Sequence, residues 1–175
     1  FKESYKYFVS KNNFSRAGNS LRYIGETYSL TNKYKKAKES LDEALVLFEK
    51  TKMFSSTEVF RNADVFKNII YTHLGALLFR ERNYSKAKWY FNESLALDIK
   101  YGSRTSGEIW NNIGLGLVNE VKKQNKEAIL NFYEAKKALL HFKLGVDMSR
   151  HHVFVSLLQD KIKHSKYRSL IADLL

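Results

Sequence analysis

Cysteine and proline are absent from this chain of 175 residues, and glycine occurs only eight times. Without cysteine, neither a disulfide framework nor a thiolate metal site can form. Proline and glycine are common in the turns of β folds, so their scarcity favours long helices joined by short turns. No stretch approaches the about 18 consecutive apolar residues of a membrane span, and the sequence therefore predicts no transmembrane segment.

The first residues, FKESYKYF, lack the continuous apolar run and the small-residue cleavage site of a signal peptide. We therefore expect a cytoplasmic protein. The chain has no initiator methionine, so we expect a segment of a larger protein. Its richness in Lys, Asn, Ile, Tyr and Phe suggests an AT-rich, bacterial genome.

Apolar residues make up 44% of the chain and aromatic residues 14%, which is ample for a packed core and argues against disorder. The 30 Lys and Arg residues outnumber the 18 Asp and Glu residues, for a formal net charge of +12. Such a charge attracts anionic partners at long range, although it does not determine the fold.

Three segments of the chain align with one another, and they are Leu21–Glu49, Tyr71–Ile99 and Trp110–Leu140. Each begins with a large residue and carries an aliphatic–glycine pair three residues later, at Ile24-Gly25, Leu74-Gly75 and Ile113-Gly114. Each then has a small–large–small series at helical spacing, namely Ala37-Leu41-Ala44, Ala87-Phe91-Ser94 and Ala128-Phe132-Ala135. Large residues three or four apart form one apolar stripe on a helix, and the small residues allow two helices to approach closely.

This pattern resembles the tetratricopeptide repeat family, and the resemblance covers roughly residues 18 to 143. It implies an all-α fold, an α-α superhelix in which antiparallel helix pairs, A and B, stack into a right-handed solenoid. One such pair cannot bury its own apolar face, whereas a stack of pairs can.

The chain departs from the family in its spacing. The signature glycines are 50 and 39 residues apart rather than about 34. The chain also lacks the proline that usually follows helix B in this family. The third segment has two extra residues between Gly114 and Ala128. We interpret the long first interval as an extended helix. The long spacing is similar to that of bacterial peptide-sensing regulators, the Rap and PlcR group, and of kinesin light chains.

We expect a single solenoid segment over 1–175, with a trailing half-repeat at 1–14, repeats at 18–51, 68–101 and 107–143, and a degenerate terminal repeat at 147–175. The expected turns between helices A and B are Thr31–Lys33, Arg82–Asn83, Lys123–Asn125 and Lys163–Lys166. Capping boxes beginning at Ser55 and Thr105, and N-caps at Ser15 and Asp147, are expected to start the A helices.

The resemblance implies that the A helices line a concave ligand groove, and we expect their remaining faces to be free of packing. The candidate groove residues are Arg22, Glu26, Thr72, His73, Phe79, Asn111, Asn112 and Asn119.

Some members of the family grip a C-terminal carboxylate with a clamp of lysine, asparagine and arginine. Glu26 and Glu108 stand at two of the corresponding positions and would repel a carboxylate, so we reject this ligand. The Asn111-Asn112 pair suits an extended peptide, because an amide both donates and accepts hydrogen bonds. The resemblance to the peptide-sensing regulators implies the same use. The alternative is that these amides only solvate the groove wall.

Half of the 30 cationic residues lie at or beside the expected turns between helices A and B, which predicts a basic edge. Cations suit the C-terminal ends of the A helices, but this does not explain cations at the N-termini of the B helices. The edge would attract nucleic acid, anionic lipid or an acidic protein, although no nucleic-acid motif accompanies it. Its candidate residues are Lys35, Lys36, Arg82, Lys86, Lys122, Lys123 and Lys126.

No pattern in the chain predicts catalysis, a cofactor or a metal. The five histidines show no HExxH motif, and neither a glycine-rich phosphate loop nor a nucleophile motif occurs. We therefore predict a non-catalytic module that binds a protein or peptide within a larger regulatory or signalling protein. The alternatives are an electrostatic docking module, which binds nucleic acid or anionic membrane through the basic edge, and a structural segment that self-associates. The oligomeric state stays open.

Overall fold

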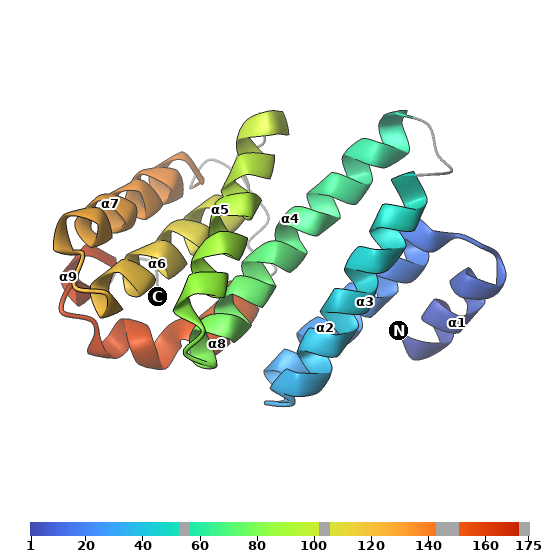
Figure 1. Ribbon diagram of the computed structural model, residues 1–175, viewed down its shortest axis with the longest axis horizontal. Helices are drawn as coiled ribbons and strands as arrows, with labels where there is room; N and C mark the ends of the chain where they lie inside the picture. The colour runs from blue at the N-terminus through green and yellow to red at the C-terminus, as the bar shows by residue number, and fades with distance from the viewer. Residues whose placement is uncertain (53–56, 102–105, 143–150, 172–175) are drawn as a thin grey trace. The chain divides into compact units, whose positions relative to one another are not determined.

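The computed structural model describes residues 1–52, 57–101, 106–142 and 151–171 (Figure 1). Within these residues every regular element is an α-helix, and helices that follow one another pack in adjacent pairs. The all-α fold class, with the helix pairing of an α-α superhelix, is thus confirmed for the described part of the chain. The helices are α1 (Lys2–Ser10), α2 (Phe14–Leu30), α3 (Tyr34–Lys52), α4 (Thr57–Arg80), α5 (Tyr84–Tyr101), α6 (Ser106–Val121), α7 (Asn125–Phe142), α8 (His151–His164) and α9 (Arg168–Ile171).

The chain divides into two compact units, Phe1–Ile70 and Tyr71–Leu175. In the first unit, α2 packs against both α1 and α3. A stripe of fully buried residues on α3, which includes Leu41 and Phe48, forms its core, and the Phe48 ring stacks on Phe66 of α4 with centroids 5.5 Å apart. Burying each such side chain contributes about 1.5–3 kcal/mol. By contrast, α1 has no buried residue.

In the second unit, α6 packs between α5 and α7, and α8 and α9 pack against α6 and α7 respectively. The largest side chains of its core, Phe91, Trp110 and Phe132, come from these three central helices and are fully buried. Residues 109 to 119 of α6 are buried on every face of the helix, which explains why this segment reads as unusually apolar in the sequence.

The signature glycines face large side chains of the paired helix, and this contact defines the repeat register. In each pair the partner lies 16 residues after the glycine, and a Cβ on the glycine would come within 2.8 Å of it. The pairs are Gly25 with Leu41, Gly75 with Phe91 and Gly116 with Phe132. The predicted alignment is therefore wrong in the third segment: Gly116 is the equivalent glycine, and no two-residue insertion exists. Gly114 instead contacts Phe91 of the preceding pair.

Four of the turns share one geometry. One residue has a positive φ, between 52° and 61°, and the next N–H bonds the carbonyl five residues earlier at 2.8–2.9 Å, as in a Schellman helix end. The positive-φ residues are Asn12, Asn32, Arg82 and Lys123. The last three fall within the turns predicted between helices A and B.

The long first interval between repeats resides mainly in α4, which has 24 residues against 17 in α2 and 16 in α6. The interpretation as an extended helix is thus confirmed. The predicted N-cap of α2 is wrong, because the Asn13 side chain, not Ser15, accepts a hydrogen bond from the Arg16 amide at 3.1 Å. The predicted caps Ser55, Thr105 and Asp147 lie outside the described residues.

Candidate functional site

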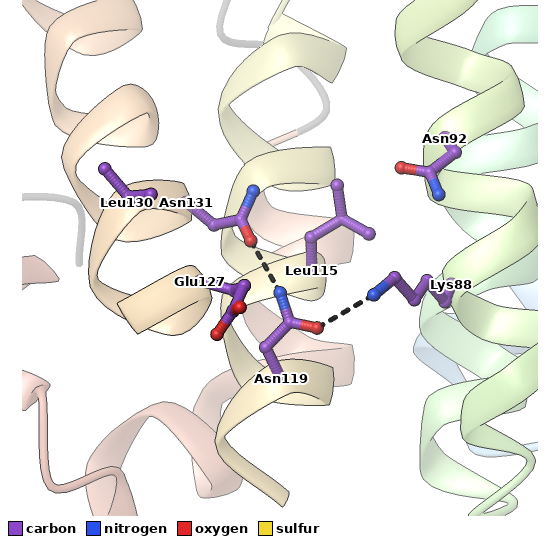
Figure 2. Close-up of a pocket in the computed structure, with 7 residues that line it drawn as sticks. All are labelled: Lys88, Asn92, Leu115, Asn119, Glu127, Leu130 and Asn131. Carbon is purple, nitrogen blue, oxygen red and sulfur yellow. Dashed lines mark hydrogen bonds between the residues drawn. The ribbon is translucent and has the colours of Figure 1, made fainter. Parts of the chain in front are cut away.

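A pocket of about 290 Å³ opens between α5, α6 and α7 in the second unit (Figure 2). It combines three amides, one cation, one carboxylate and two leucines. The lining residues are Lys88, Asn92, Leu115, Asn119, Glu127, Leu130 and Asn131.

Helical spacing places these side chains on common faces. Residues three or four apart are neighbours on one side of a helix. The lining residues are four apart on α5 and on α6, and three or four apart on α7. They occupy the first turns of α5 and α7 and the last turns of α6, so the pocket lies next to the α4–α5 and α6–α7 turns.

A chain of hydrogen bonds crosses the pocket floor. Lys88 Nζ donates to Asn119 Oδ1 at 3.1 Å, and Asn119 Nδ2 donates to Asn131 Oδ1 at 2.8 Å. The chain continues from Asn131 Nδ2 to Asn112 Oδ1 at 3.4 Å, and Asn112 Nδ2 donates to the Glu108 carbonyl at 2.9 Å. These bonds orient the amides, and each amide or ammonium group has further donor capacity that they do not use.

The pocket also offers opposite charges on opposite walls. Figure 2 shows Lys88 reaching in from α5, with Asn119 between it and Glu127 of α7. Leu115 is buried in the floor, whereas Leu130 at the mouth is 63% exposed. The site therefore suits a ligand with polar groups along its length and at least one apolar group.

A separate buried polar cluster links α4, α5 and α6. Ser94 Oγ accepts a hydrogen bond from Asn111 Nδ2 at 2.8 Å and pairs with Thr72 Oγ1 at 2.9 Å. All three side chains are at most 1% exposed. Alanine stands at the equivalent of Ser94 in the other two helix pairs, at Ala44 and Ala135, so the hydroxyl serves this cluster and not the repeat in general.

The eight candidate groove residues are all buried, so the expectation that they lie on faces free of packing is wrong. In the first unit, Arg22 pairs with Glu26, and its guanidinium lies 3.9 Å from the centroid of the Tyr23 ring. In the second unit, α8 covers part of the A helices, because Phe154 stacks on Trp110 with centroids 5.7 Å apart and lies tilted against His73 with centroids 5.5 Å apart.

Only Asn119 among those eight residues lines the pocket. Asn111 and Thr72 belong to the buried cluster, and Asn112 supports the pocket amides from behind. Whether any of them binds a ligand stays a prediction. Sequence reasoning missed Asn92, Glu127 and Asn131 because they lie on B helices, which the resemblance assigns to the outer side of the repeat.

The seven candidate residues of the basic edge are all exposed. Lys35 and Lys36 begin α3 in the first unit, and the other five flank the α4–α5 and α6–α7 turns in the second.

None of the helices in the described ranges combines the length and the hydropathy of a membrane span. No group of three His, Asp or Glu side chains in the same residues could hold a metal ion. No family model matches the chain, and no curated protein or solved structure shows significant similarity to it.

Proposed function

We propose that this chain is a non-catalytic recognition module that binds an extended segment of a protein or peptide in the α5–α6–α7 pocket. The observation that carries the proposal is the convergence of the amides of Asn92, Asn119 and Asn131 from three helices on one pocket. An extended main chain presents N–H and C=O groups in alternation, and an amide side chain can satisfy either. The resemblance to the tetratricopeptide repeats points the same way, and with it to a larger regulatory protein.

The size of the pocket supports a segment over a compact small molecule. Its volume, about 290 Å³, is at the lower limit of the roughly 300–1,000 Å³ typical of sites that enclose small ligands. Glu127 and Leu130 at its edge are exposed, so a longer chain could extend from the pocket over the surface. Leu115 and Leu130 would hold one apolar side chain of the segment.

The affinity expected from this site is modest. A hydrogen bond to an amide contributes about 0.5–1.5 kcal/mol net, and association itself costs several kcal/mol. A few such bonds with one apolar anchor correspond to a Kd on the order of micromolar.

Selection from a phage-displayed library of random peptides, followed by isothermal titration calorimetry, tests the proposal. We expect the selected peptides to bind about fivefold more weakly to Asn92→Ala, since it loses one hydrogen bond of about 1 kcal/mol. Leu130→Ser should weaken them further. Tyr133→Ser and Glu134→Ala change exposed residues of the same helix outside the pocket and serve as matched controls. Peptides whose affinity responds to the controls but not to the pocket variants would refute the proposed site.

A further inference from the structure

We infer that the segment bound in the pocket is acidic, and that a basic rim beside the pocket holds its carboxylates. The basic rim consists of the exposed side chains Arg82, Lys86, Lys122, Lys123, Lys126 and Lys166. The inference rests on the proposed function and names the chemistry of its partner.

The basic rim is continuous with the pocket. Asn119 and Glu127 line the pocket, and the segment between them carries three of the rim lysines. They are Lys122 and Lys123 in the α6–α7 turn and Lys126 at the start of α7. On the other wall, Lys88 follows Lys86 by two residues at the start of α5. Lys166 joins the rim from the α8–α9 turn, where its Nζ donates to Asn125 Oδ1 at 2.7 Å. A chain that leaves the pocket at its turn end therefore meets these cations next.

Carboxylates of the protein do not neutralise the basic rim. The acidic residues at these turns are Glu81, Glu120 and Glu127, against six rim cations and Lys88. Glu120 already accepts hydrogen bonds from the Ser165 hydroxyl at 2.6 Å and the Lys166 amide at 2.9 Å. Within the described residues, no ion pair involves any of the rim cations.

Four rim cations occupy locally unfavourable positions. The repeated turn places asparagine at positive φ in the first unit, but Arg82 and Lys123 in the second, with φ of 61° and 59°. Asparagine tolerates this conformation better than a long side chain, which costs about 1–2 kcal/mol there. Lys86 and Lys126, in turn, lie in the first turns of α5 and α7, where the helix dipole disfavours cations. The dipole of α4 and α6 favours Arg82, Lys122 and Lys123 at the helix C-termini. It does not explain Lys86 and Lys126, and an acidic partner accounts for both sets.

The surface favours a polypeptide over the other polyanions. Glu127 lies between the pocket and the basic rim. A nucleic acid carries a negative charge at every phosphate and would bring phosphates against this carboxylate. A polypeptide can place a neutral residue there and donate its amide N–H to Glu127. The pocket likewise takes an apolar side chain between acidic ones, which neither a phosphate backbone nor a lipid headgroup supplies.

Fluorescence anisotropy with a short labelled peptide, in which aspartates flank a central leucine, tests the inference. A serine peptide, with every aspartate replaced, is the reference. We expect the serine peptide to bind at least about tenfold more weakly at low salt, and the difference to shrink as salt screens the charges. Lys123→Glu with Lys126→Glu should weaken the aspartate peptide by about tenfold and leave the serine peptide unchanged. The matched control, Lys35→Glu with Lys36→Glu, makes the same charge change beside the equivalent turn of the first unit.

The outcomes separate the two proposals. If Leu130→Ser affects neither peptide, the pocket is not the site and the proposed function fails. If Leu130→Ser weakens both peptides but aspartate and serine bind alike, the pocket stands and the acidic partner is wrong. Equal losses in the rim and control variants would show an effect of net charge alone. Tighter binding of single-stranded polyuridine or of phosphatidylserine vesicles, abolished by the rim variant, would overturn the polypeptide in favour of that polyanion.

Discussion

Replacement of Gly114 by alanine is a direct test of the packing that joins α4, α5 and α6. The buried Phe91 ring of α5 contacts Gly114 of α6 and Gly75 of α4. A Cβ on Gly114 would lie 2.3 Å from Phe91 Cζ and 2.4 Å from Cε2. Carbon atoms normally approach to about 3.5–4.0 Å, so the ring or the helix would have to move by about 1 Å. The ring has no room toward α4, because a Cβ on Gly75 would already lie 2.6 Å from its Cε1.

Two effects oppose each other in this variant. Alanine is better than glycine inside a helix by about 1 kcal/mol. Overpacking a core costs about 1–3 kcal/mol, and the confined ring places Gly114→Ala near the upper end. We therefore expect the free energy of unfolding to fall by about 1–2 kcal/mol. In a Phe91→Leu background the clashing ring atoms are gone, so the same change should instead raise it by about 0.5–1 kcal/mol.

Urea unfolding followed by far-UV circular dichroism measures both values, with the m-value as a check on cooperativity. Gly18→Ala provides a graded comparison, because its Cβ would lie 3.0 Å from Phe48 Cζ and needs a smaller shift. A stabilising effect of Gly114→Ala in the native background would refute the reasoning. So would an equal cost with and without the Phe91 ring.

Three further predictions follow from the same structure. Ser94→Ala removes the shared hydrogen-bond partner of Thr72 and Asn111, so the free energy of unfolding measured in urea should fall by about 1–3 kcal/mol. The control Ser40→Ala should change it little, because it loses only a bond to the Lys36 carbonyl of its own helix. Lys123→Gly relieves the positive φ and should raise the unfolding free energy by about 0.5–1 kcal/mol, while Lys122→Gly, at a position without positive φ, should not; equal effects would contradict this account. The hydrogen bond to Glu43, then burial and the Glu43 charge, raise the pKa of Tyr5 above its ordinary 10.0. The protonated Tyr5 hydroxyl therefore stabilises the fold below about pH 10, and this stabilisation is lost as the pH rises through the raised pKa. Tyr5→Phe should reduce the loss of stability at alkaline pH, which denaturant unfolding at a series of pH values measures.

Periodicity was sufficient to predict the helices, because burial in this fold follows the helical repeat. The stripe Ala37, Leu41 and Ala44 is fully buried on α3, and Ala128, Phe132 and Ala135 repeat it on α7. The turns were predictable for a related reason, since polar residues interrupt the stripes at Thr31–Lys33 and Arg82–Asn83.

The register of the third repeat was not predictable in this way. Gly114 and Gly116 are two residues apart, and both suit a signature glycine. Only the packing distinguishes them, because Gly116 faces Phe132 of its own pair while Gly114 faces Phe91 of the previous one. A pattern along one helix does not contain that information.

The sequence by itself determined an all-α chain, its helix boundaries to within a few residues, the small–large series that pairs the helices and the positions of the cationic turns. Each of these depends on residues close together along the chain, where helical geometry is the same in any fold. The tertiary structure decided the rest. It buried Asn111 against Ser94, placed Phe154 of α8 against the expected groove residue His73, and brought Asn92, Asn119 and Asn131 together at one pocket. Such contacts depend on which faces of the helices meet. The packing of side chains from several helices decides this, and the sequence of any one helix does not contain it.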